Sequence, residues 1–324
     1  MSKKKSQYQN EPPHVYDNEI DLLELWSILW QGKWIISVMT LFFAVASVIY
    51  ALSLPDIYRS EVLLSPAEQE NSSNVSLSGQ LGGLASLAGI NIGESSATSN
   101  KTKALATLRS RVFLYDFFKD HNITVPLMAS RPSGRSGDVE IDPEIYDEQN
   151  LRWVREVQPP MQPEPTNWEV YNTFIDILDI VEDPATGLIT VAIEWYDQQK
   201  IKEWLSWLIA DLNEEMRLND TLEASRAINY LTEQLGTTQL VEMRNMFYTL
   251  IEQQTRTIML ADAREGYAFE IIDPPIIPER RSAPSRSIIC IVITFLGGVF
   301  SVIFVFIYQI VKINKLKNKE SILK

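Results

Sequence analysis

The chain has 324 residues and a formal net charge of −13, from 42 acidic and 29 basic side chains. A chain of this length holds one domain of moderate size or two small ones. Nucleic-acid-binding domains carry a basic surface, so the acidic balance excludes that class of partner. The mean hydropathy of −0.07 is ordinary for a soluble protein, but the average hides an uneven distribution of apolar residues.

Two runs without a charged residue are long enough to cross a membrane. Residues 34–54 form a run of 21 residues, which as a helix would span roughly 31 Å, the thickness of a bilayer's hydrocarbon core. Residues 288–311 form a second run of 24 residues. A cleaved signal peptide is the alternative for the first run, but the run is too long and lacks a small-residue cleavage site. The sequence therefore predicts transmembrane helices at 34–54 and 288–311.

Charge is divided unequally between the remaining parts. The ends, residues 1–33 and 312–324, together carry nine lysines and six acidic side chains, whereas residues 55–287 carry 20 basic and 36 acidic ones. Lysine-rich ends stay in the cytoplasm, and long domains cross the membrane largely regardless of arginines beside a span. We therefore expect cytoplasmic termini and a 233-residue outer domain.

The N-terminal segment 1–33 is expected to contain an interfacial helix. Apolar side chains recur at helical spacing within residues 20–30, at Leu22, Leu25, Trp26 and Leu29. Tryptophans at headgroup depth are typical of membrane anchoring, which we favour over a partner-binding role.

The outer domain is predicted to contain a sheet. Residues 58–64 have strand composition, and residues 173–181 and 188–195 alternate apolar and polar side chains around a turn-forming stretch. This pattern is typical of a β-hairpin. A further strand is expected at 267–272.

Helices and a loop complete the base of this domain, predicted at 55–196 and 265–287. Residues 101–120 form an amphipathic pattern, with Leu105, Leu108, Val112 and Tyr115 on one face. Residues 129–166 are rich in proline, glycine and charge and predict a surface loop with short strands.

Residues 197–264 predict an extended helical region. These residues include no proline, and as one helix they would measure about 100 Å, more than a compact domain allows. The helical region must therefore project from the base. Gly236 is the best candidate for the turn of a helical hairpin, and one kinked helix is the alternative.

A segment rich in serine, asparagine and glycine, residues 71–100, contains an apolar stretch. Its leucines predict a flap over the sheet or a contact with a neighbouring subunit. These candidate oligomer contacts are Leu77, Leu81, Leu84 and Leu87. A phosphate-binding loop at Gly82-Gly83 is disfavoured because no GK[ST] follows.

Two further features concern the second span. Prolines make a stiff, extended lead-in to it, at Pro274, Pro275, Pro278 and Pro284. Within the span, Gly297 and Ser301 form a small-xxx-small pair that Gly298 widens, so another helix could pack closely there. Ordinary glycine tolerance in membrane helices is the alternative.

No catalytic, metal-binding or cofactor-binding pattern emerges. His14 and His121 are too few and too separated for a zinc site. The 36 acidic groups of the outer domain supply carboxylate pairs by chance, which does not define a glycosidase. Cys290, the only cysteine, lies in the second span, so the outer domain has no disulfide. We expect a protein that is not an enzyme.

Taken together, four features resemble the Wzz-type polysaccharide co-polymerases, the O-antigen chain-length determinants. These features are EIDLLELWSILWQGKWII at the first span, LGGLASLAG in the outer domain, the helical region before IIDPPIIPE, and the Gly-Gly pair of the second span. One departure is Ala283-Pro284, where the family tends to have Ser-Pro. Related capsule and exopolysaccharide co-polymerases share the first two features but carry a tyrosine kinase, and residues 312–324 hold no P-loop.

The resemblance implies an α+β periplasmic domain, with a membrane-proximal α/β base and long projecting helices, anchored in the bacterial inner membrane by two transmembrane helices. It implies a regulator that sets the modal chain length of O-antigen made by a Wzy-dependent polymerase. Its partners would be further copies in a ring-like homo-oligomer, the polymerase and lipid-linked polysaccharide. The alternative is an export adaptor for capsule or exopolysaccharide that works with a separate kinase.

Overall fold

The computed structural model describes residues 22–67, 96–133, 139–264 and 266–322. The chain forms two compact units. The first, Met1–Leu54 with Ser285–Lys324, is called here the helix-pair unit, and the second, Pro55–Pro284, the α+β unit. The mixture of helices and strands agrees with the predicted fold class.

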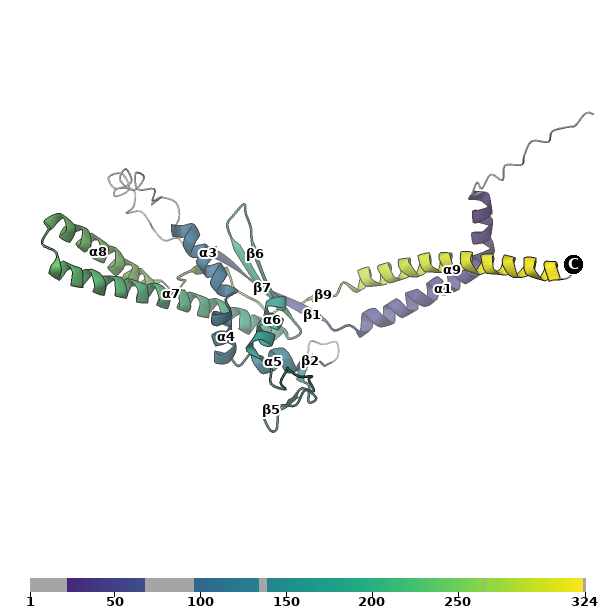
Figure 1. Ribbon diagram of the computed structural model, residues 1–324, viewed down its shortest axis with the longest axis horizontal. Coiled ribbons are helices and arrows are strands. Elements are labelled where there is room, and N and C mark those ends of the chain that lie inside the picture. The colour runs from purple at the N-terminus through teal and green to yellow at the C-terminus, as the bar shows by residue number, and fades with distance from the viewer. Residues whose placement is uncertain (1–21, 68–95, 134–138, 265, 323–324) are drawn as a thin grey trace, which may run out of the picture. The chain divides into compact units, whose positions relative to one another are not determined.

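The helix-pair unit consists of α1 (Leu22–Ser53) packed against α9 (Arg286–Ile322). Among the described residues, two stretches are long and apolar enough to cross a membrane, Gly32–Ser53 and Arg286–Gln309. Both stretches overlap the spans predicted from the sequence. Helix α1 bends along its length (Figure 1), and its first turns from Leu22 are continuous with the apolar stretch instead of forming a separate helix.

In the part of the chain that the structure describes, the α+β unit is built on a five-stranded antiparallel sheet in the order β6-β7-β1-β8, with β9 also paired to β1. The strands are β1 (Ile57–Pro66), β6 (Leu178–Glu182), β7 (Ile189–Trp195), β8 (Phe269–Asp273) and β9 (Arg281–Ala283). The predicted hairpin is confirmed as β6–β7, and the predicted strands at 58–64 and 267–272 are confirmed as β1 and β8.

The two faces of the sheet differ in polarity because side chains alternate along each strand. On one face, Val62 of β1 lies opposite Val191 of β7, and both are buried in the core. On the other face, the Arg59 guanidinium pairs with Asp179 at 3.0 Å and with Glu194 at 3.2 Å. One buried face and one solvated face are usual for antiparallel sheets.

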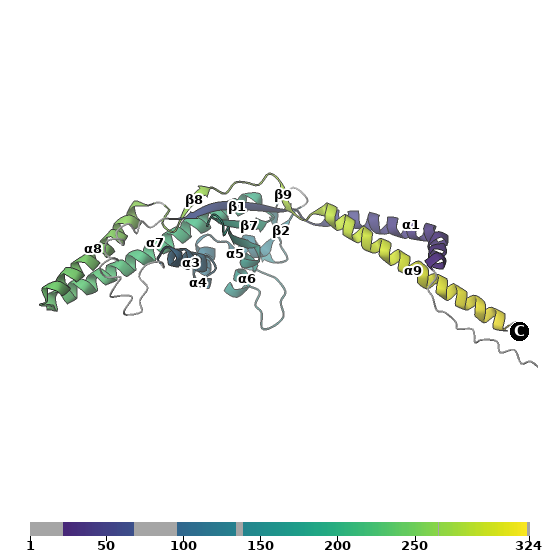
Figure 2. The same ribbon diagram turned by 90° about the horizontal axis from the view of Figure 1, so that it is seen from above.

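Helices cover the apolar face of the sheet (Figure 2). They are α3 (Ser96–Leu108), α4 (Arg111–Asp120), α5 (Thr124–Ala129), α6 (Asn167–Ile177) and the first part of α7 (Gln198–Thr237). Two small hairpins lie between α5 and α6: β2 (Ser130–Pro132) with β3 (Val139–Ile141), and β4 (Tyr146–Asp147) with β5 (Arg152–Trp153). The predicted loop with short strands is therefore confirmed.

The prediction of one helix over 101–120 is wrong. The chain leaves helical geometry at Ser110, which separates α3 from α4. This break turns α4 so that its phenylalanines, Phe113, Phe117 and Phe118, face the core. Val112, which the amphipathic pattern places on the buried face, is 73% exposed.

The first strand of the hairpin is also shorter than predicted. Residues 167–177 form α6, which begins at Thr166, whose hydroxyl accepts a hydrogen bond from the Glu169 amide. Val170 and Phe174, four residues apart, are buried on one face of this helix. The helical period therefore prevails over the alternating pattern until Leu178.

The extended helical region is a hairpin, which decides between the two alternatives. Helix α7 and helix α8 (Val241–Ala263) lie side by side and project from the sheet in both views (Figures 1 and 2). The turn lies at 238–240, and Gly236 belongs to the last turn of α7. Gly236 is therefore not the turn residue.

Candidate functional site

Small residues allow α1 and α9 to approach closely. A Cβ atom added to Gly297 would lie 2.5 Å from Cβ and Cγ of Phe43, so a glycine is required there. One turn later, Ser301 is buried and its Oγ lies 3.4 Å from Thr40 Oγ1. Gly298 has room, since an added Cβ would be 3.9 Å from Thr40. The structure thus places Gly297 and Ser301 against α1 of the same chain.

The prolines of the predicted lead-in lie along the edge of the sheet. Pro274, Pro275 and Pro278 follow β8, and Pro284 follows β9, and both strands pair with β1. Between them, Ser60 Oγ donates a hydrogen bond of 2.8 Å to the Ile276 carbonyl. Proline lacks an amide donor and is tolerated at sheet edges. These prolines therefore shape the edge of the α+β unit as well as the approach to α9.

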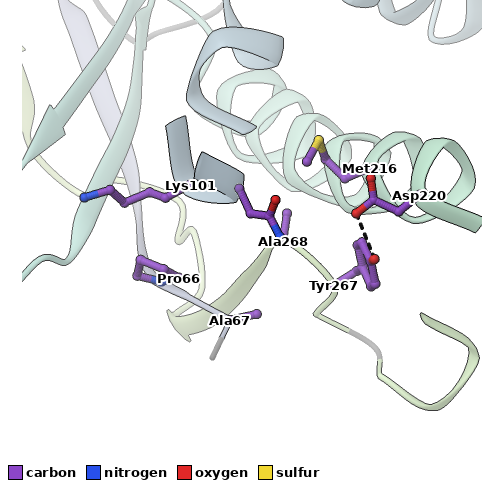
Figure 3. A pocket seen from close by; sticks show the side chains of 8 residues that line it. Pro66, Ala67, Lys101, Met216, Asp220, Tyr267 and Ala268 are labelled. Atoms are coloured by element: carbon purple, nitrogen blue, oxygen red, sulfur yellow. Dashed lines mark hydrogen bonds between the residues drawn. The ribbon is translucent and has the colours of Figure 1, made fainter. Parts of the chain in front are cut away.

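The candidate oligomer contacts Leu77, Leu81, Leu84 and Leu87 lie outside the described residues. Ala67, the last described residue before that segment, lines a small cavity beside the middle of α7. The cavity is lined by residues at the end of β1, on α3 and on α7, and by the segment before β8 (Figure 3). They are Pro66, Ala67, Asn100, Lys101, Met216, Asp220, Tyr267 and Ala268.

Asp220 joins three parts of the α+β unit at this cavity. Its Oδ2 accepts a hydrogen bond of 2.8 Å from the Tyr267 hydroxyl (Figure 3), and its Oδ1 accepts one of 2.9 Å from Lys103 Nζ. Burial, with the hydrogen bond to Asp220, raises the pKa of Tyr267, so the phenol stays a neutral donor. The arrangement holds α3, α7 and the segment before β8 together.

A buried amide fixes β8 against α7. Asn213 Nδ2 donates to the Phe269 carbonyl at 3.0 Å, and Asn213 Oδ1 accepts from the amides of Ala268 and Phe269, each at 2.9 Å. Asn213 is 9% exposed. One side chain thus satisfies three backbone groups at the start of the strand, where unpaired groups would be costly.

Neither Asn213 nor Tyr267 was predicted as a site residue. A signal for Asn213 was present, because it lies among the apolar positions of α7, between Leu212 and Met216, where a polar side chain needs a partner. Its partner, the backbone of β8, is more than 50 residues away and has no marker in the sequence.

The described side chains show no cluster of three or more His, Cys, Asp or Glu that could hold a metal ion. His121 has a structural environment: its ring stacks on Trp207 with centroids 4.6 Å apart, and its Nε2 lies 2.8 Å from Asp211 Oδ2. His121 thus connects the end of α4 to α7.

These features define a class of protein: an α+β unit inserted between two helices that can each cross a membrane. Residues 18–121 match the family model described as Wzz, chain length determinant protein. Over these residues the chain is similar to the Wzz family, and the resemblance to Wzz-type polysaccharide co-polymerases is confirmed.

The solved structures that are similar to the chain include two polysaccharide co-polymerases. A full-length bacterial polysaccharide co-polymerase has 13% identity and a TM-score of 0.39, over 90% of this chain and 98% of that one. A fragment of WzzB, the polysaccharide co-polymerase from Salmonella Typhimurium, has 13% identity and a TM-score of 0.29, over 71% of this chain and 100% of that one. No curated protein matches the chain.

Proposed function

We propose that this protein is a regulator that sets the modal chain length of lipopolysaccharide O-antigen made by a Wzy-dependent polymerase. The observation that carries the proposal is the chain length determinant match over residues 18–121, which begins before α1 and continues through β1 and α3 into the end of α4. The description of the matched family supports the general part of the proposal, regulation of polysaccharide chain length. The polymer and the polymerase are its finer parts.

The proposed location is the bacterial inner membrane, with both termini cytoplasmic. The apolar stretches Gly32–Ser53 and Arg286–Gln309 would be the anchors. The α+β unit would face the periplasm, which agrees with its acidic composition and the lysines of the chain ends. In terms of domains, we propose a cytoplasmic segment 1–33, spans at 34–54 and 288–311, a periplasmic part at 55–287 and a tail at 312–324.

We propose that the protein acts without catalysis, as a scaffold. Its partners would be further copies of itself in a ring-like homo-oligomer, the polymerase and lipid-linked polysaccharide. The exposed apolar side chains of the α7–α8 hairpin, such as Leu222, Val241 and Met246, are between 52% and 65% exposed and would be available to neighbouring copies.

The experiment is a deletion of the gene, complemented with the intact gene and with a vector control. We expect the deletion strain to polymerise O-antigen without a preferred length, and the intact gene to restore the preferred length on a lipopolysaccharide gel. An unchanged length distribution in the deletion strain would overturn the proposal. Loss of capsule with normal O-antigen would instead favour the export adaptor that works with a separate kinase.

A further inference from the structure

A larger cavity, of about 360 Å³, lies between α7, α8 and β8. This volume lies in the range of small-molecule sites, roughly 300–1,000 Å³. Apolar side chains of Ala210, Ala261 and Ile271 line part of it. Polar side chains line the rest, among them those of Ser206, Glu214, Arg217 and Asp262.

The charges around this cavity balance each other. Arg217 donates through Nε and Nη2 to Glu214, at 2.9 and 2.7 Å, and its Nη1 lies 3.6 Å from Asp262 Oδ1 on α8. Arg264 also lines the cavity, so two guanidinium groups face two carboxylates. An anionic ligand would gain no net attraction from this lining.

The polar groups keep hydrogen-bonding capacity toward solvent. The side chains of Arg217, Glu214 and Asp262 are 34%, 49% and 68% exposed. A guanidinium has five donors and a carboxylate has about four acceptor positions, more than their mutual contacts use. Such a lining matches a neutral ligand with several hydroxyl groups and an apolar ring face.

The walls of the cavity are fixed without a ligand. Tyr267, which is 7% exposed, forms part of the wall and is held by its hydrogen bond to Asp220. Asn213 also lines the cavity while it holds the start of β8. A site that is already ordered loses little conformational entropy on binding.

We propose that the cavity between α7, α8 and β8 binds an uncharged sugar residue of the polysaccharide whose length the protein regulates. This inference rests on the proposed function. The hydroxyl groups of the sugar pair with Arg217, Glu214 and Asp262, and the ring lies against the apolar wall. Through this contact the scaffold binds the growing chain directly and weakly.

The test uses the full-length protein in lipid nanodiscs. The probe is a mixture of short, delipidated O-antigen oligosaccharides, released by mild acid from the lipopolysaccharide of the strain that carries the gene. Binding is followed by saturation-transfer NMR and titration calorimetry. The variant Ala210→Trp fills the cavity, and Ala106→Trp makes the same change at an exposed position on α3 outside it.

We expect saturable binding that Ala210→Trp weakens by about tenfold or more, because a filled cavity excludes the ring, while Ala106→Trp leaves it unchanged. Arg217→Gln, which keeps the cavity open, should weaken binding severalfold. Circular dichroism confirms the fold of each variant. Absence of saturable binding, or equal binding by the Ala210→Trp and intact proteins, overturns the inference. If the gene deletion still abolishes the preferred length, the proposed function stands while this inference fails.

Discussion

At Gly297, the absence of a side chain decides how closely two helices approach. An alanine Cβ there would overlap the Phe43 side chain, whereas the neighbouring Gly298 has room for a methyl group. We expect Gly297→Ala to destabilise the α1–α9 contact by about 1–3 kcal/mol, as overpacking usually does. Gly298→Ala should change stability by less than about 0.5 kcal/mol.

Thermal unfolding of the two glycine variants in the same detergent, followed by circular dichroism of the helices, measures the difference. Because both substitutions raise helix propensity equally, the comparison isolates the contact with Phe43. Equal melting temperatures would show that α1 and α9 do not pack through Gly297.

Asn213 supports the second residue-scale prediction. Asn213→Ala removes three hydrogen bonds and leaves backbone groups of Ala268 and Phe269 without that partner. We expect a loss of about 2–4 kcal/mol in the free energy of unfolding, measured by urea denaturation. Asn219→Ala on the same helix is the control. The Asn219 side-chain amide donates to the exposed Glu215 carboxylate one turn earlier, so its loss should cost less than about 0.5 kcal/mol.

Hydrogen exchange at the Phe269 amide adds a local measurement. The amide should lose protection in Asn213→Ala and keep it in Asn219→Ala. If the two variants unfold at the same urea concentration, Asn213 does not hold β8.

At the scale of elements, two glycines differ in position: one lies in a hairpin turn and the other in the last turn of a helix. Gly187, in the β6–β7 hairpin, has a φ of +71°, whereas Gly236 lies inside α7, and neither would place a Cβ within 4 Å of another group. We expect Gly187→Ala to destabilise by about 1 kcal/mol because alanine is strained at positive φ. Gly236→Ala should be neutral or stabilising by up to about 1 kcal/mol. Urea unfolding of the two variants checks the signs; destabilisation by Gly236→Ala would place a turn at that residue.

The junction of α3, α7 and β8 should also respond to high pH. Burial raises the pKa of Tyr267 above its ordinary value of 10.0. The folded state therefore holds the phenol proton more tightly than the unfolded state, so its contribution is complete below pH 10 and decreases as the pH rises further. We expect the urea midpoint to fall as the pH rises from 10 to 12, by less in Tyr267→Phe than in the intact protein. Tyr248→Phe, at an exposed position on α8, is the control, and an identical pH dependence in both variants would contradict the role of Tyr267.

Element identity was largely predictable from the sequence because long periodic patterns, such as those of α7 and α8, depend on local spacing. Boundaries were less predictable where tertiary packing competed with the local pattern. Ser110 interrupts a continuous amphipathic pattern so that Phe113 and Phe117 reach the core, and this reason appears only in three dimensions. The cavities were not predictable, because Asn213 is about 50 residues away from Asp262 and Tyr267 in the sequence and meets them only when β8 lies beside α7 and α8.

At the scale of the whole molecule, membrane orientation yields a direct prediction. With Cys290 replaced by serine, single cysteines at Thr186→Cys, in the exposed β6–β7 turn, and at Lys312→Cys, on exposed α9, report on the two sides. In cells with a permeabilised outer membrane, a membrane-impermeant maleimide should label Thr186→Cys, because the α+β unit is proposed to be periplasmic. It should label Lys312→Cys only after lysis. Labelling of Lys312→Cys in unlysed cells would reverse or reject the proposed topology.

The pairing of the first and last strands gives the α+β unit a closed form. Ile57, three residues after the helix-pair unit ends, is the sheet partner of Ala283, two residues before that unit resumes. Paired strands lie about 5 Å apart, so the fold brings together two chain ends separated by more than 200 residues. The pairing of β1 with β9 therefore holds the two ends of the α+β unit side by side at one edge of the sheet.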